Sequence, residues 1–153
     1  MRIKITADST CDLSAEVVSK YDIGIIPLYV IKGEQVLRDG VDITKEDVFR
    51  YYEESRSLCT TSAINVEDYI KFFSGWLKDY DAVVHINLSS ELSSCYANAA
   101  AAAKELGNVY PVDSRNLSNG SGHLAVDAAI LAAGGMNGEE IQKRLKRAGI
   151  SSR

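Results

Sequence analysis

The sequence of 153 residues lacks the features that mark a membrane-spanning or exported chain. Its apolar runs are much shorter than the roughly 18 residues that a membrane-spanning helix requires. Met1 leads directly into RIKITAD, without the charged segment and the apolar segment of a secretory leader. We therefore expect a cytoplasmic protein without a membrane span.

An excess of basic residues is also missing, since 17 Lys and Arg stand against 21 Asp and Glu and the net charge is −4. Apart from a cluster at 143–147, the basic residues are scattered, which argues against a nucleic-acid partner. That cluster is most simply the solvated end of a helix, where cations also interact favourably with the helix dipole.

The three cysteines, Cys11, Cys59 and Cys95, indicate neither a disulfide framework nor a metal site. Their number is odd, and they form no C-x-x-C pair and no Cys/His ligand spacing. We expect them to be small filler residues in a reducing compartment. We expect no metal, and no cofactor besides a bound ligand.

Two common enzyme motifs are absent: the P-loop pattern G-x-x-x-x-G-K-[ST] and the nucleophile elbow G-x-S-x-G. The segment Gly120–Ala125 does match the dinucleotide-binding pattern G-x-G-x-x-A. However, several residues separate it from the strand predicted to end at Asp113, and no acidic strand end follows about 20 residues later. His85, in a predicted strand, and His123, at a predicted helix start, have no visible Ser or Cys partner, so we predict structural roles for both.

Short β-branched runs alternate with amphipathic segments along the chain. The predicted strands are Ile3–Asp8, Ile23–Ile31, Ala82–Leu88 and Val109–Asp113. The predicted helices are Ser14–Lys20, Thr44–Glu54, Asn65–Tyr80, Ser93–Leu106, Ser121–Ala133 and Asn137–Arg147. This alternation predicts an α/β fold with an open, mostly parallel sheet and helices on both faces. A turn at Arg38–Gly40 between apolar residues predicts a small hairpin appended to the sheet.

Two helix starts are well defined, because Thr44 and Asn65 are each followed three residues later by a carboxylate, Asp47 and Asp68, as in a capping box. In the helix predicted over 65–80, the apolar residues follow the i, i+3, i+4, i+7 rule. We predict that this apolar stripe is core and not a cofactor site.

Two hydroxyl-rich stretches, CTTSAIN at 59–65 and LSSELSSCY at 88–96, each precede a predicted helix. Backbone N–H groups and hydroxyls at a helix N-terminus favour a bound anion. Neither stretch contains the Lys or Arg that a phosphate usually recruits, so the pattern favours a carboxylate with an apolar tail. The polar segments 8–10 and 113–114 follow predicted strands and would gather at the same edge of the sheet, where open α/β sheets bind ligands.

Five motifs along the chain are characteristic of one protein family: ITADSTCDL (Ile5–Leu13), TTS (Thr60–Ser62), SSELSSCY (Ser89–Tyr96), VDSRNLSNGSG (Val112–Gly122) and GGMNGEEI (Gly134–Ile141). They occur in the order and spacing of the DegV family, which they resemble along essentially the whole chain. DegV proteins are bacterial fatty acid-binding proteins, and some act as the lipid-presenting B subunit of fatty acid kinase. The resemblance implies a lipid-binding protein that is not an enzyme and whose partner is the catalytic subunit of a fatty acid kinase.

The resemblance also implies which residues hold the fatty acid. Thr61 and Ser93 correspond to hydroxyls that hold the fatty acid carboxylate, and Ser62 and Ser90 lie beside them. Further residues expected to line the site are Asp8, Ser9, Asn65, Cys95, Asp113 and Ser114. The expected ligand is a long-chain fatty acid.

Family members are nearly twice as long, and the resemblance implies a second α/β domain with the acyl chain in a tunnel between the two. We therefore expect residues 1–153 to be a single lipid-binding α/β domain that lacks the second one, either as a fragment or as a short relative that self-associates. An alternative is a hydrolase or acyl transferase with Ser93 or Cys95 as nucleophile and Asp8 or Asp113 as orienting acid. A third is a remnant that binds no ligand.

Overall fold

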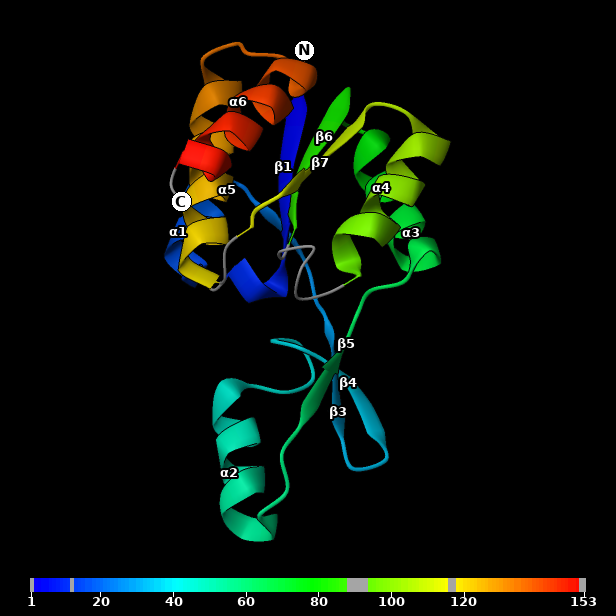
Figure 1. The fold of residues 1–153 in the computed structure, drawn as a ribbon, viewed down its shortest axis with the longest axis vertical. Helices are drawn as coiled ribbons and strands as arrows, with labels where there is room; N and C mark the ends of the chain where they lie inside the picture. Colours follow the sequence, from blue (N-terminus) through cyan, green and yellow to red (C-terminus); the bar gives the residue numbers. More distant parts are fainter. Residues whose placement is uncertain (1, 12, 88–93, 116–117, 152–153) are drawn as a thin grey trace.

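The computed structural model describes residues 2–11, 13–87, 94–115 and 118–151 (Figure 1). The strands are β1 (Ile3–Asp8), β2 (Gly24–Ile26), β3 (Tyr29–Lys32), β4 (Gln35–Arg38), β5 (Thr60–Ser62), β6 (Ala82–Asn87) and β7 (Val109–Asp113). The helices are the 3-10 turn η1 (Ser9–Cys11), α1 (Ala15–Lys20), α2 (Lys45–Ser55), α3 (Val66–Leu77), α4 (Cys95–Leu106), α5 (Ser118–Ala133) and α6 (Gly138–Ser151).

The larger part of the molecule is a parallel sheet with the strand order β2-β1-β6-β7. Thr6 of β1 pairs with Gly24 of β2 on one side and with His85 of β6 on the other. Helices α3 and α4 cover one face of this sheet, and α5 and α6 cover the other (Figure 1). This arrangement confirms the predicted α/β fold with an open, mostly parallel sheet.

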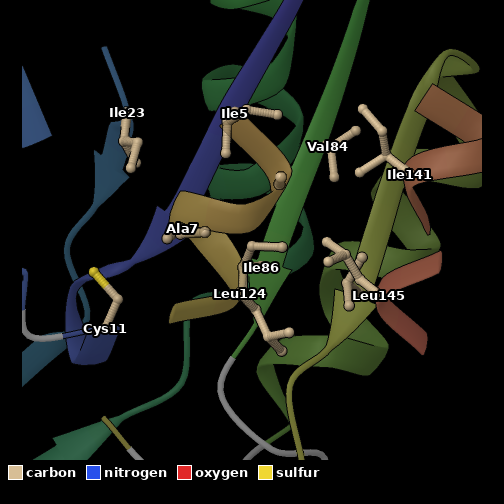
Figure 2. Packing of buried hydrophobic residues seen from close by; sticks show 12 residues of the cluster. Ile5, Ala7, Cys11, Ile23, Val84, Ile86, Leu124, Ile141 and Leu145 are labelled. Atoms are coloured by element: carbon tan, nitrogen blue, oxygen red, sulfur yellow. The ribbon is translucent and has the colours of Figure 1, made fainter. Parts of the chain in front are cut away.

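Each face of the sheet has its own apolar core. Between the sheet and helices α5 and α6, Ile5 and Val84 lie in one cluster with Leu124, Ile141 and Leu145 (Figure 2). The central strands β1 and β6 are buried along nearly their whole length, as expected for parallel strands covered on both faces.

The second core confirms the predicted apolar stripe of α3. Tyr69 and Phe73 are completely buried, and their rings stack with centroids 5.5 Å apart. They pack in one cluster with Val83 of β6 and with Ala99 and Ala102 of α4. The small alanine side chains let α4 lie close to the sheet.

The smaller part of the molecule consists of the antiparallel sheet β4-β3-β5 and helix α2, which extend beyond one end of the parallel sheet (Figure 1). The sequence predicts one parallel strand over Ile23–Ile31, and this is wrong. The segment divides into β2, in the parallel sheet, and β3, in the small sheet. Pro27 lies between the two strands and has no N–H to donate to a ladder, so pairing is interrupted there.

This region contains a hairpin, but it is not the predicted one, because its turn does not lie at Arg38–Gly40 and it belongs to the small sheet instead of the parallel sheet. Strands β3 and β4 are joined by Gly33 and Glu34, with Lys32 paired to Gln35. Gly33 has a φ of 60°, which a tight two-residue loop requires and which glycine adopts without strain.

The two predicted N-caps are confirmed. Thr44 Oγ1 accepts from the Asp47 N–H at 3.1 Å, and Asp47 Oδ2 accepts from the Thr44 N–H at 3.0 Å, which is a complete capping box. Asn65 Oδ1 accepts from the Asp68 N–H at 2.8 Å. The Asp68 carboxylate instead accepts from the Tyr29 hydroxyl at 2.6 Å, and this bond ties α3 to the small sheet.

The G-x-G-x-x-A match has a packing explanation. A Cβ at Gly122 would lie 2.8 Å from the Cys11 carbonyl oxygen and 3.0 Å from Leu13 Cδ2. Glycine therefore permits the close approach of α5 to the segment that follows β1.

Candidate functional site

The carboxyl ends of the parallel strands form one polar edge. Strands β1, β6 and β7 end at Asp8, Asn87 and Asp113, and Asn87 pairs with Asp113. The Ser114 N–H donates to the Asn87 carbonyl at 3.2 Å, so the chain continues across this edge after β7. The small sheet lies beyond the same end of the parallel sheet (Figure 1). The structure thus brings together Asp8, Asp113 and Ser114, as the sequence predicts.

Asp8 is the centre of a buried hydrogen-bond network at this edge. Its Oδ1 accepts from the Tyr69 hydroxyl at 2.9 Å and lies 2.8 Å from His85 Nε2. Its Oδ2 accepts from Asn87 Nδ2 at 3.2 Å. With 1% of its surface exposed, Asp8 needs these donors, because a buried carboxylate without partners is strongly destabilising. Asp8 is therefore an internal structural group, withdrawn from any ligand at the surface.

His85 is fully buried and uses both ring nitrogens within this network. An ionised carboxylate only accepts, so Nε2 carries the proton that is shared with Asp8. The other nitrogen, Nδ1, lies 2.7 Å from Thr6 Oγ1. Because both nitrogens are bonded to side chains that are themselves buried, Thr6 and Asp8, the geometry supports the predicted structural role of His85.

Tyr69 links the network to the start of α4. Burial, followed by the charge of Asp8 and by Cys95, raises the pKa of Tyr69 far above its ordinary value. The phenol therefore stays protonated and donates to Asp8. Cys95, the first residue of α4, is completely buried and hydrogen-bonds to Tyr69. Its thiol faces the core, which leaves the alternative of a Cys95 nucleophile without access to a substrate.

Asn87 is the remaining member of the network. Its Nδ2 also donates to the Tyr69 hydroxyl at 3.2 Å. Within the part of the chain that the structure describes, its Oδ1 is buried without a hydrogen-bond partner. Buried polar atoms without partners are uncommon. The Asn87 side chain, at the end of β6, thus has a buried acceptor without a described donor at the edge where a ligand is expected.

Thr61 and Ser62 do not lie at a helix N-terminus, which corrects the sequence-based expectation. They belong to strand β5, where Thr61 pairs with Val30 and Ser62 with Tyr29, and both are exposed. The first turn of α3 begins only after the N-cap Asn65. β-branched residues favour extended backbone, and β3 offers a free edge for them to pair with, so the threonines extend the small sheet instead of opening the helix.

The N-terminus of α4 lies close to the segment between β5 and α3. Asn98 Nδ2 donates to the Ile64 carbonyl at 2.8 Å. Ser94, the N-cap of α4, makes no side-chain capping bond. The predicted ligand residues Ser90 and Ser93 lie outside the described residues, and α4 begins at Cys95, later than the predicted start at Ser93.

Ser9 holds the end of β1 against the small region. Its hydroxyl donates to Asp39 Oδ2 at 2.8 Å and accepts from the Leu28 N–H at 3.0 Å. It also lines a cavity of about 460 Å³ between the carboxyl-end edge and the start of α2, together with Ile25 and Pro27. Since both hydrogen-bonding functions of Ser9 are used, its visible role is to position the two parts of the molecule.

Tyr69, His85 and Asn87 are the site-edge residues that sequence reasoning did not assign to the site. His85 and Asn87 alternate with apolar residues in a strand, and Tyr69 belongs to a core stripe, so no local motif marks them. The signal available in the sequence was the presence of polar residues within a strand that is otherwise apolar, since such groups need buried partners.

Neither a metal site nor a membrane span is evident in the described parts of the chain. Among residues 2–11, 13–87, 94–115 and 118–151, no three His, Cys, Asp or Glu side chains are grouped so that they could hold a metal ion. The described helices include none with the length and apolar content needed to cross a bilayer.

The strand order and the covering helices define an open α/β domain, a class in which ligands generally lie at the carboxyl ends of the strands. The family model described as "Uncharacterised protein, DegV family" matches residues 2–149. The chain therefore belongs to the DegV family.

Individual relatives agree with this membership. A DegV domain-containing protein of Clostridium perfringens is 36% identical over 146 residues, covering 94% of this chain and 52% of that protein. A fatty acid-binding protein of Thermotoga maritima is 35% identical over 152 residues, covering 96% and 51%. The crystal structure of DegV, a fatty acid binding protein from Bacillus subtilis, has a TM-score of 0.91 at 31% identity, covering 97% of this chain and 54% of that one. The chain thus spans about half the length of these relatives.

Proposed function

We propose that this chain binds a fatty acid, with the carboxylate at the carboxyl-end edge of the parallel sheet. The observation that carries the proposal is the match of nearly the whole fold to DegV proteins that are described as binding fatty acids. The geometry supports the position, because Thr61 and Ser62 expose neutral hydroxyls on β5, in the small sheet beyond this edge, while the carboxylate of Asp8 is satisfied inside the core. The second carboxylate of the edge, Asp113, accepts from the Arg115 N–H.

Two groups of donors would meet at the carboxylate. Thr61 and Ser62 expose their side chains on β5. The N-terminus of α4, which has no side-chain cap from Ser94, favours an anion through its N–H groups and its dipole. The bond from Asn98 to the Ile64 carbonyl keeps the segment after β5 beside α4. Ser90 and Ser93 would complete this set of donors.

We further propose that the ligand is presented, without catalysis, to the catalytic subunit of a fatty acid kinase in the cytoplasm. Support comes from the family resemblance and from the inaccessibility of the Cys95 thiol and of both His85 nitrogens. In the full-length context, a second domain would form the other wall of the acyl-chain site. Without that domain, the apolar residues that line the acyl chain would face solvent, and we expect self-association to cover them.

The test is the affinity for a fluorescent long-chain fatty acid in two matched variants. Thr61→Val removes the proposed donor but keeps a β-branched side chain of similar size. Thr60→Val makes the same change on the adjacent residue of β5, whose side chain points to the opposite face of the strand. Loss of a hydrogen bond to a charged group costs about 1 to 3 kcal/mol, so we expect Thr61→Val to weaken binding roughly tenfold or more and Thr60→Val to change it little. Equal affinity in the wild type and Thr61→Val would contradict the assignment of Thr61.

A further inference from the structure

A second cavity, of about 530 Å³, lies between β7 and α6. Its floor includes Pro111 and Val112 of β7, which are buried. Tyr96 of α4 and Gln142 of α6 contribute to its walls. A volume of this size is typical of sites for small molecules, which occupy about 300 to 1,000 Å³.

The charge of this cavity is opposite to that of the whole chain. Arg115, Lys143 and Lys146 line it, against the single carboxylate of Asp113. The Asp113 Oδ1 accepts from the Arg115 N–H at 3.0 Å, so that oxygen is engaged with its own loop. Although the chain has a net charge of −4, this cavity has an excess of positive groups. The fold creates this excess because it brings Arg115, which follows β7, close to two lysines of α6.

The burial of one side of α6 separates its basic residues into two groups. Ile141 and Leu145 are buried in the core, which fixes the orientation of the helix. Lys143 and Lys146 are three residues apart and both line the cavity. Arg144, between them, is exposed and does not line it. The basic cluster that the sequence suggests to be a solvated helix end is therefore divided by the structure into cavity-lining and outward-facing charges.

One contact anchors this part of α6 to the strand, and a second pairs one of its lysines within the helix. Gln142 Nε2 donates to the Pro111 carbonyl at 2.9 Å, which anchors this turn of α6 to β7. Lys143 pairs with Glu139 at 3.1 Å, but both side chains are more than 60% exposed. Such exposed pairs contribute little to stability, so the Lys143 ammonium can exchange this partner for a more highly charged ligand.

We propose that this cavity binds a small molecule through a phosphoryl group, held by Arg115, Lys143 and Lys146. Arginine offers a planar set of donors that matches phosphate oxygens, and lysine supplies point charges. This donor set differs from the neutral hydroxyls of the candidate fatty acid edge. It matches a doubly charged group. The cavity adjoins the carboxyl-end edge, with which it shares Asp113, and Lys143 and Lys146 of α6 distinguish it from that edge. The phosphoryl group comes either from a soluble metabolite or from a phospholipid headgroup.

The experiment is an NMR titration of the intact chain with inorganic pyrophosphate at constant ionic strength, with sodium chloride as the reference. We expect saturable shifts at the amides of 111–115 and 141–146. Lys146→Gln and Lys143→Gln should each weaken binding about tenfold, because each removes a charge-assisted contact. Arg144→Gln removes the same charge from the same helix, away from the cavity, and should change the affinity less than twofold.

Lys143, Arg144 and Lys146 are all exposed, so these variants should fold, and spectra that are unchanged elsewhere in the protein would verify this. A parallel titration with short-chain phosphatidic acid below its micelle concentration separates the two sources. Tighter binding than pyrophosphate assigns the headgroup of a lipid, and equal or weaker binding assigns a soluble phosphate. Shifts that do not saturate, or an equal loss of affinity in Arg144→Gln, would overturn the proposal, because the attraction would then be nonspecific.

Discussion

The parallel-sheet part and the small part of this molecule bury their side chains very differently. The parallel sheet has a core on each face and places even its polar side chains Thr6, Asp8 and His85 inside with hydrogen-bond partners. Helix α2 of the small part contains no buried residue. Among the described residues, the four most exposed large apolar side chains all belong to the segment 36–58: Leu58, Phe49, Val36 and Val41.

This difference shows where stability comes from in each part. The parallel sheet is stabilised by burial of apolar surface on two faces and by an internal polar network. The small part has few buried apolar residues, such as Val30 and Ile43, and depends more on local features, namely the Thr44 capping box, the hairpin turn at Gly33 and the ladders of β3. It should therefore open locally at a low free energy, while the parallel sheet opens only with global unfolding.

The largest expected effect is at the centre of the buried network. Asp8→Ala leaves the donors of Tyr69, His85 and Asn87 without their acceptor. Removing one member of a buried charged network costs about 3 to 5 kcal/mol, so we expect a loss of this size in the free energy of unfolding measured with urea. Asp127→Ala removes an exposed carboxylate and should change it by less than about 0.5 kcal/mol. Similar values for the two variants would show that the network does not stabilise the sheet.

Replacing glycine by alanine should change the stability in opposite directions at two positions of the parallel-sheet part. At Gly122, an added methyl group meets the Cys11 carbonyl at 2.8 Å, and such overpacking costs about 1 to 3 kcal/mol. At Gly75, on the exposed side of α3, nothing lies within 4 Å of an added Cβ. Gly75→Ala should stabilise the protein by roughly 0.5 to 1 kcal/mol, since alanine is the better helix former. Thermal unfolding of both variants checks this, and stabilisation by Gly122→Ala would refute the close approach of α5.

The sequence alone predicts the parallel-sheet part better than the small part. Strands β1, β6 and β7 of the parallel sheet were predictable, because they are β-branched runs that end at polar residues. The division at Pro27 and the strand at Thr60–Ser62 were not predicted, because pairing with β3 is a tertiary interaction that short segments do not encode. For the same reason Thr61 was placed at a helix N-terminus, although the capping residue Asn65 was identified correctly.

A smaller and local effect is expected in α2. Thr44→Ala removes half of the capping box and should cost about 1 kcal/mol, which corresponds to roughly fivefold faster hydrogen exchange. If the small part opens independently, this acceleration will be confined to amides of α2 and its flanks. Equal acceleration in β1 and β6 would show that the two parts unfold as one unit.

The smallest expected effect is the pH dependence of the same helix. The hydrogen bond from the Thr44 backbone N–H, and then that from its hydroxyl, lowers the pKa of Asp47. Because the pKa is lower in the folded state, this contribution to the stability of α2 is present above the ordinary carboxyl pKa of about 3.9 and is lost as the pH falls through the folded value. A carboxyl ¹³C titration should find Asp47 below that ordinary value. Titration at or above it would mean that the capping box does not form in solution.

The most direct test of the central claim is a map of amide shifts during titration with a long-chain fatty acid below its micelle concentration. The account predicts saturable shifts at the carboxyl-end edge, in the amides of 61–65, 95–98 and 113–115. Phe49 and Leu58, the two most exposed large apolar residues, should shift little at saturation. Saturable shifts confined to 36–58, or to α6, would contradict the proposal that the carboxylate lies at the edge of the parallel sheet.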